Sequence, residues 1–298
     1  MSAIGGEAPL DEVEAAVAEA LVRVSDEGLR ILGYGEITLV VGWPAAEPAW
    51  ACKRLPVFAD DGAAARYREQ FDRYLDLLAD RGVTPVPSTL TTLPAATDGG
   101  GIAAYVVQPA LPAGSLGPDV LRAASPDPDH PLLARVCAAV PEVVDPRTGL
   151  DGQISNWALV GDQLQYLDVT TPMLFDDGGR FELELDLFLA AYPWALRAPI
   201  RRFVAPGVVG AYRDARHVLL DLAANLIKER LEPWLPAAVE AANRVVTPAI
   251  TVEEARAYYR SDARMWEVLL RLRRADRWWQ ARVRRRSYPF LLPGRIER

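Results

Sequence analysis

The segment GLDGQISNWALVGDQLQYLDVTTP (149–172) holds the residues that decide the fold. Its two apolar runs, ISNWALV and LQYLDV, flank the turn-forming GDQ, which predicts a hairpin of two short strands. Asp151 and Asn156 lie on the loop that leads into the first run, and Asp168 ends the second. Such a hairpin brings Asn156 and Asp168 close together, so both can hold one hard cation, while the Asp151 carboxylate is suited to face a hydroxyl nucleophile.

Toward the N-terminus the chain alternates amphipathic helices with short apolar strands. Apolar residues recur every three or four positions over 10–24 and 62–82, which predicts a leading helix and a second, longer one. Strands are expected over 29–43 and 49–58, as three successive antiparallel strands, and over 83–93 and 102–108. The Gly/Pro-rich connector 111–118 places a boundary between an N-terminal part, 1–111, and a helical part, 112–298.

Two features of the N-terminal part are suited to phosphate. Gly33 and Gly35 flank Tyr34 between apolar strands, where glycines let a hairpin backbone approach phosphate oxygens. Lys53 lies on the third strand and is one of only two lysines, the other 31 basic residues being arginines. A carboxylate to pair with it is expected on the following helix, from Glu69 or else Asp72.

Helices are also expected over 210–231 and 236–246, and from the capping box at Thr251 to about Arg286. The face of the 210–231 helix that carries Asp221, Asn225 and Lys228 is interpreted as a surface ladder of polar contacts, with the border of an acceptor pocket as the alternative.

The ordered set Gly33/Gly35, Lys53, Glu69, Asp151, Asn156 and Asp168 resembles the protein-kinase-like superfamily, in spacing most of all the aminoglycoside-phosphotransferase-like small-molecule kinases. The resemblance covers about residues 27–190 and implies an α+β, two-lobed fold: a small N-terminal lobe with an antiparallel sheet and one long helix, and a larger helical C-terminal lobe.

The resemblance also implies roles for single residues. Gly33 and Gly35 would cover the phosphates of ATP, Lys53 held by Glu69 would bind the α- and β-phosphates, and Gln108 to Ala110 would receive adenine. In the C-terminal lobe, Asp151 would act as catalytic base in the loop 149–159, and Asn156 and Asp168 would bind Mg²⁺. The implied activity is ATP- and Mg²⁺-dependent phosphotransfer to a hydroxyl of a small-molecule acceptor that the sequence does not identify.

Some positions depart from the family pattern. Gly149-Leu150 stand where the family usually has a histidine near the catalytic aspartate, and Val169-Thr170-Thr171 follow the metal-binding aspartate in place of Phe-Gly. These departures argue against a regulated protein kinase. They leave open a catalytically weak pseudokinase that binds nucleotide or serves as a scaffold.

Composition narrows the remaining classes. No stretch of about 18 residues is free of charge, and the acidic N-terminus lacks the order of a secretory signal, so we expect no membrane span and a cytoplasmic protein. Two cysteines and two histidines are too few for a structural zinc site. The net charge is −7, yet residues 260–298 hold 12 arginines and 4 acidic residues.

This basic C-terminal helix raises the question of a partner. It could contact nucleic acid, anionic lipid or the acidic remainder of the chain; Trp278 and Trp279 among the arginines would suit stacking on bases. The same tryptophans also fit a stripe that packs against other helices, so we do not expect nucleic acid as a partner. The sequence leaves the oligomeric state undetermined.

Overall fold

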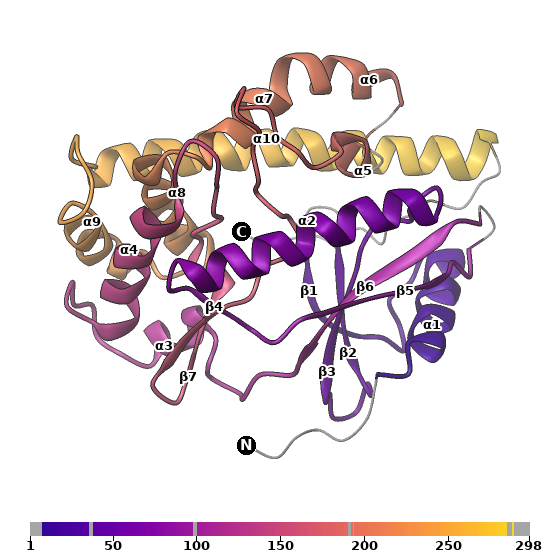
Figure 1. Cartoon of the computed structure of the whole chain (residues 1–298), viewed down its shortest axis with the longest axis horizontal. Coiled ribbons are helices and arrows are strands. Elements are labelled where there is room, and N and C mark those ends of the chain that lie inside the picture. Colours follow the sequence, from indigo (N-terminus) through magenta and orange to yellow (C-terminus); the bar gives the residue numbers. More distant parts are fainter. Residues whose placement is uncertain are drawn as a thin grey trace.

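The fold is mixed α+β, with an antiparallel sheet in the N-terminal part and helices in the C-terminal part (Figure 1). The computed structural model describes residues 8–35, 38–97, 100–189, 192, 194–284 and 288. The main sheet has the order β1-β2-β3-β6-β5, with every neighbouring pair antiparallel. Its strands are β1 (Arg30–Tyr34), β2 (Leu39–Trp43), β3 (Trp50–Arg54), β5 (Thr89–Pro94) and β6 (Ile102–Pro109). The three successive antiparallel strands expected at the start of the chain are confirmed.

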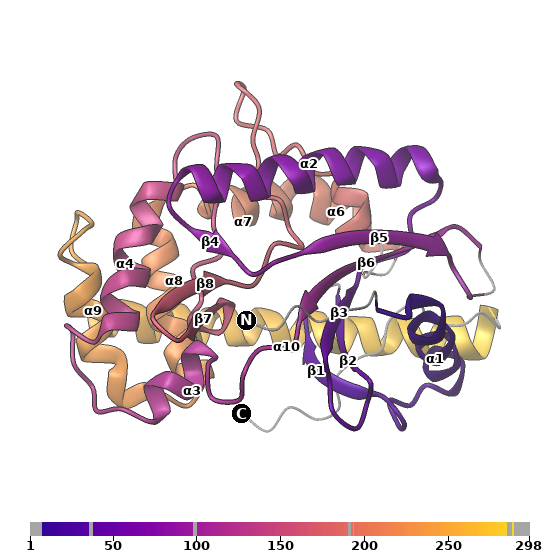
Figure 2. The same cartoon turned by 60° about the horizontal axis from the view of Figure 1, so that its bottom comes forward.

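One helix covers each face of this sheet (Figure 2). Helix α1 (Leu10–Arg23) packs on one face, through a cluster that includes Ala103 and Tyr105 of β6. Helix α2 (Asp61–Asp80) covers the other, through a cluster that includes Ala104 and Val106. Because side chains alternate along a strand, β6 serves both helices, and most of its residues are apolar.

The cap, the apolar periodicity and the terminal glycine in the sequence predict helix α2. Asp60 caps its first turn by accepting a hydrogen bond from the Ala63 backbone N–H at 2.8 Å. The buried residues Tyr67, Phe71 and Tyr74 recur every three or four positions, so they form one inward face. Gly82, at φ 77°, follows the helix in the left-handed conformation that glycine adopts without strain.

The expected strand over 83–93 is two strands in two sheets. Strand β4 (Thr84–Pro85) pairs in parallel with β8 (Gln163–Tyr166), which pairs antiparallel with β7 (Trp157–Val160). Strand β5 then returns to the main sheet. The prolines at 85 and 87 have no N–H to donate to a ladder, which interrupts the run. The expected hairpin after Asp151 is β7 and β8.

Side-chain caps mark the start of two of the three predicted C-terminal helices. The helix expected over 210–231 is α8 (Ala215–Lys228), since Asp214 caps it by accepting from the Arg216 N–H. The helix expected over 236–246 is α9 (Leu235–Ala242). Thr251 caps α10 (Val252–Trp279), which continues as a π-helical segment, Gln280–Arg284; Arg286 lies outside the described residues.

Several further helices, most of them short, are not predicted by the sequence patterns above. They are α3 (Gly117–Arg122), α4 (Pro131–Val143), the 3₁₀ turns Ile154–Asn156 and Glu232–Trp234, α5 (Leu185–Leu189), α6 (Trp194–Pro199), the π-helical Ile200–Val204 and α7 (Ala205–Ala211). A single apolar cluster runs from Leu55 and Phe71 in the N-terminal part to Leu222 and Leu235 in the C-terminal part. Among the described residues, no helix is both long enough and apolar enough to cross a membrane.

Candidate functional site

The loop before β7 is pressed against helix α8. Gly152 separates Asp151 from Gln153, and a Cβ built on it would lie 2.6 Å from Cγ1 of Val218 on α8. Real carbon atoms do not approach so closely, so only glycine lets the loop run this near the helix. The loop therefore holds Asp151 against the helical part of the chain.

Asn156 directly precedes β7, and Asp168 follows β8. Both residues therefore lie at the open end of the β7–β8 hairpin, which brings them together. The Leu167 backbone N–H donates to the Asn156 carbonyl oxygen at 2.8 Å. Asn156 Nδ2 donates to the Asp151 carbonyl oxygen at 3.3 Å. Asp168 Oδ1 accepts from the Thr170 hydroxyl at 2.7 Å. The three polar residues expected in this segment therefore lie near one another, at the loop and the open end of the hairpin.

Lys53 reaches the same point from the main sheet. Its side chain is 8% exposed, and Nζ donates to the Leu167 carbonyl oxygen at 2.6 Å, one residue before Asp168. Burial lowers the pKa of this ammonium below its ordinary value, and the negative charge of Asp168 offsets part of that effect. Lys53 thus supplies a buried positive charge beside the acidic loop.

Gln108 also binds this loop, through its side chain. Its Nε2 donates to the same Leu167 carbonyl oxygen at 3.0 Å and to the Ser88 hydroxyl at 2.9 Å. The Ala110 N–H, expected to face adenine, donates instead to the Ala49 carbonyl oxygen at 2.9 Å, because the β3–β6 ladder extends past Pro109. The structure therefore leaves the Ala110 N–H with a partner inside the sheet.

Glu69 is not brought to Lys53. It lies on the exposed side of α2, as does Asp72, because the inward positions of that helix are taken by its aromatic residues. One of these, Tyr67, donates its hydroxyl to the Thr170 carbonyl oxygen at 2.8 Å, two residues after Asp168. Over the described part of the chain, no carboxylate forms an ion pair with Lys53.

Gly33 and Gly35 lie at the end of β1. Gly33 pairs with Val40, which pairs with Lys53, so the three residues form one row across β1, β2 and β3. The Gly35 N–H donates to the Thr38 carbonyl oxygen at 2.9 Å, and a Cβ on Gly35 would collide with the Thr38 side chain. Glu36 and Ile37, which follow Gly35 in the sequence, lie outside the described residues.

Gln153 is a site residue without a signal in the sequence. Its backbone N–H donates to Asp151 Oδ1 at 3.1 Å, and its Nε2 donates to Asp221 Oδ2 of α8 at 2.9 Å. Asn225, one turn further along α8, donates from Nδ2 to Gln153 Oε1 at 3.2 Å. The interpretation of this α8 face as a surface ladder is wrong, because Asp221 and Asn225 are buried and bind the loop of Asp151 through Gln153.

The acidic groups of the site repel one another. Burial, followed by the negative charges of Asp221 and Asp168, raises the pKa of Asp151 to about 7. Burial likewise raises the pKa of Asp221, while Gln153, His217 and Lys228 act in the opposite direction. The second lysine of the chain therefore also acts on this cluster, from the exposed end of α8.

The donor set fits a hard cation. Carboxylate and amide oxygens from Asp168 and Asn156 are the ligand type that Mg²⁺ takes, with water or substrate oxygens completing its octahedron. Groups of three or more His, Cys, Asp or Glu side chains placed to hold a metal do not occur among the described residues. A cation at Asn156 and Asp168 would thus take its remaining ligands from water or from a bound phosphate.

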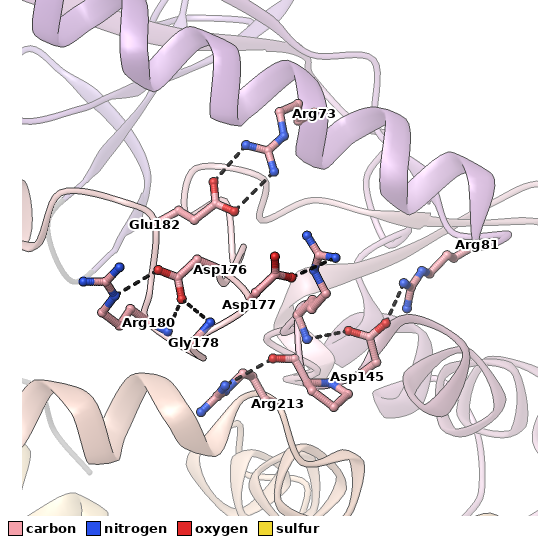
Figure 3. A network of polar contacts seen from close by, with 11 residues as sticks. Arg73, Arg81, Asp145, Asp176, Asp177, Gly178, Arg180, Glu182 and Arg213 are labelled. Atoms are coloured by element: carbon pink, nitrogen blue, oxygen red, sulfur yellow. Dashed lines mark hydrogen bonds and ion pairs between the residues drawn. The ribbon is translucent and has the colours of Figure 1, made fainter.

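The segment after Asp168 is tied to α2 and to the preceding loop by surface polar contacts (Figure 3). Arg73 of α2 pairs with Glu182 at 2.8 Å, and Arg81 at the end of α2 pairs with Asp145 at 2.6 Å. Between them, Asp176 accepts from Arg180 in a tight turn. A cavity of about 260 Å³, lined partly by Phe58, Tyr67 and Glu182, lies between α2 and this segment.

Comparison with known proteins gives one family and a distant structural likeness. Among solved structures, the chain is similar to the PknI kinase domain of Mycobacterium tuberculosis, crystallised as a C20A mutant, with 16% identity and a TM-score of 0.32 over 80% of this chain and 96% of that one. The search of curated proteins finds no match. A family model matches residues 12–277, and the chain therefore belongs to the Family of unknown function (DUF6206).

Proposed function

We propose that the chain has a two-lobed protein-kinase-like fold and transfers the γ-phosphoryl group of ATP, with Mg²⁺, to a hydroxyl of a small molecule. The arrangement of elements supports the fold: α2 follows β3 and crosses the antiparallel sheet, and the connector 110–116 leads from β6 into helices. The two lobes correspond to residues 1–111 and 112–298.

The observation that carries the activity is the position of Lys53. Its ammonium group bonds to the main chain beside Asp168, while Asn156 bonds to the main chain of Asp151. A buried positive charge, two carboxylates and an amide are thereby collected from segments far apart in sequence. Phosphoryl transfer depends mainly on such positioning and charge neutralisation.

Each residue then has a role. Lys53 binds the α- and β-phosphates, Asn156 and Asp168 hold Mg²⁺, and Asp151 orients the acceptor hydroxyl and receives its proton. Val40 and Ala51 lie on the same sheet face as Lys53, by register and by alternation, and offer an apolar surface to a flat base. Gly33 and Gly35 let the β1–β2 turn approach the phosphates.

Nucleotide binding tests the site directly. We expect Mg²⁺-ATP to raise the melting temperature of the purified protein, and Asp168→Asn to abolish the Mg²⁺-dependent part of that rise. Asp72→Asn, on the exposed side of α2, is the matched control and should leave it unchanged. An equal rise in Asp168→Asn and the parent protein would contradict the proposed metal site.

Turnover tests the chemistry. With ATP and a panel of hydroxyl compounds, Asp151→Asn is expected to lower the transfer rate by about 10²- to 10⁴-fold while nucleotide affinity stays nearly the same. Unchanged transfer in this variant would remove Asp151 from the reaction.

A second candidate function rests on Glu69. Because it faces solvent and Lys53 bonds to a backbone carbonyl instead, the Lys–Glu ion pair of active protein kinases is not formed. This arrangement favours a pseudokinase that binds nucleotide without transferring phosphate. A protein that binds Mg²⁺-ATP tightly but neither hydrolyses it nor phosphorylates any acceptor would establish this function.

A further inference from the structure

The second half of helix α10 carries apolar side chains that face water. Met265 is 42% exposed, Val268 55%, Trp279 46% and Val283 50%. Trp278, beside them, is 61% exposed. Large apolar groups are costly to leave in water, and a row of them on one helix commonly marks an interaction surface.

These residues form a continuous stripe. At 100° per residue, Met265, Val268 and Trp279 fall within roughly 60° of the helix circumference and span about 21 Å along its axis. Val283 follows in the π-helical segment that continues α10. Arg264, Arg271 and Arg282 form a second row next to it, and all three are exposed. We call these seven residues together with Trp278 the α10 face.

The α10 face borders the side by which the helix packs. Among the buried residues of α10, Ala255 and Arg273 lie about 80° around the circumference from Met265, and Asp276 lies about 20° from it. Both whole-chain views show α10 running along the long axis of the molecule to one end of it (Figures 1 and 2).

The composition of the α10 face selects its partner. An apolar stripe with tryptophan, bordered by arginines, is the pattern of helices that lie in the interface of an anionic bilayer. The arginines complement the phosphates of such lipids, and the indole rings suit the headgroup level. Nucleic acid would use the arginines but would leave the aliphatic Met265 and Val268 without apolar contacts.

A second copy of the helix is a poorer partner. In an antiparallel pair, the arginine row of one copy would face the same row of the other, and like charges repel. In a parallel pair, Asp276 of the second copy would have to form the ion pair with Arg271. Asp276 is buried within its own chain and is not available for this contact.

We propose that the α10 face binds the surface of a membrane rich in anionic phospholipid, with the helix lying in the plane of the headgroups. This peripheral association is independent of the phosphotransfer proposed above. It assigns a role to the basic segment that the site near Asp168 does not use.

Vesicle co-sedimentation of the full-length chain tests the proposal. We expect binding to vesicles of equal parts phosphatidylcholine and phosphatidylserine, weakened by salt, and little binding to phosphatidylcholine alone. Val268→Asp should lower the partition coefficient about tenfold or more. The matched control is Val245→Asp, another exposed valine, 39% exposed and distant in sequence from the α10 face, which should bind as the parent does.

A charge variant keeps the test independent of helix stability. Arg264→Gln with Arg282→Gln should weaken binding about fivefold for each arginine. Arg147→Gln with Arg180→Gln removes the same charge from two exposed loops and should weaken vesicle binding much less.

Three results would overturn the proposal. The first is an absence of binding to the phosphatidylserine vesicles at low salt. The second is equal binding by Val268→Asp and the parent chain. The third is a dimer in sedimentation, or an oligonucleotide complex, that Val268→Asp abolishes while vesicle binding is absent; this would assign the α10 face to a second copy or to nucleic acid.

Discussion

Glu14 and Arg54 form an ion pair buried between α1 and the main sheet. Arg54 Nε and Nη2 donate to the two Glu14 carboxylate oxygens at 2.7 and 2.8 Å, and the Tyr105 hydroxyl adds a third bond at 2.6 Å. Glu14 is 1% exposed. Burial raises the pKa of Glu14, but the hydrogen bonds and the charge of Arg54 outweigh burial and leave that pKa below its ordinary value.

Replacing Glu14 by Gln should therefore destabilise the protein strongly, by about 3–5 kcal/mol at neutral pH, because Arg54 would remain buried without its counter-charge. A carboxylate whose pKa is lowered on folding stabilises above its unfolded pKa and loses that effect as pH falls through its folded pKa. The difference between Glu14→Gln and the parent in urea unfolding should narrow below about pH 4.5. Glu12→Gln, exposed on α1, serves as control; a difference that does not change with pH would contradict the account.

The raised pKa of Asp151 has an effect on stability opposite to that of the lowered pKa of Glu14. The folded protein holds this proton up to about pH 7, whereas the unfolded chain loses it near the ordinary value of 3.8. The Asp151 carboxyl thus destabilises the metal-free fold progressively as pH rises from about 4 to about 7.

Asp151→Asn should consequently stabilise the protein in the presence of a chelator, more at pH 8 than at pH 5, in urea unfolding at the two values. A gain that is the same at both pH values would show that burial and the charges of Asp221 and Asp168 do not raise the pKa of Asp151.

At the scale of elements, helix α8 supports the loop of Asp151 through Gln153. The amide of Gln153 donates to Asp221 and accepts from Asn225, which fixes its orientation. Its backbone N–H then holds the Asp151 carboxylate. Gln153 is a positioning residue because it acts on the reaction through Asp151.

A charge exchange tests this positioning. Gln153→Glu alone should lower kcat, because the new carboxylate faces Asp221, with little change in Mg²⁺-ATP affinity. Adding Asp221→Asn restores a donor opposite the carboxylate and should recover much of the lost rate. Gln163→Ala, at the exposed start of β8, is the control. A double variant no faster than Gln153→Glu would indicate that the pair does not position Asp151.

How far the sequence predicts these elements depends on where their determining contacts lie. Helices α1, α2 and α10 and the β7–β8 hairpin follow from periodicity, caps and a turn, all local in the chain. The split into β4 and β5 depends on a partner, β8, about 80 residues away. Local pattern does not contain such a pairing.

The residues of the site also divide into those that the local sequence predicts and those that it does not. The sequence brings Asp151, Asn156 and Asp168 together because one hairpin connects them. It selects Lys53 by its rarity among arginines, and that residue does reach Leu167. It does not reveal that Tyr67 rather than Glu69 faces inward, since both fit an amphipathic helix, nor that Gln153 bonds to α8.

At the scale of the whole molecule, the boundary at residue 111 does not divide the apolar core. The cluster that contains Phe71 of α2 also contains Leu132 of α4 and Leu222 of α8. Tyr74 of α2 donates its hydroxyl to the Gly149 carbonyl oxygen at 3.1 Å. The two parts of the chain therefore share buried surface that neither could cover alone.

We expect a single unfolding transition in calorimetry, with equal calorimetric and van't Hoff enthalpies, and we expect fragment 1–111 to lack a cooperative transition because α2 would expose its aromatic face. Two separate transitions in the full chain, or a cooperatively folded fragment, would show that each part has an independent core.

The carbonyl oxygen of Leu167 receives hydrogen bonds from both Lys53 and Gln108. Because this acceptor belongs to the main chain, every amino acid at position 167 would offer it. Substituting the side chain of Leu167 therefore cannot remove the hydrogen bonds from Lys53 and Gln108. Only a change in the peptide linkage itself, such as an ester between residues 167 and 168, would weaken the oxygen that joins the sheet to the metal-binding end of the hairpin.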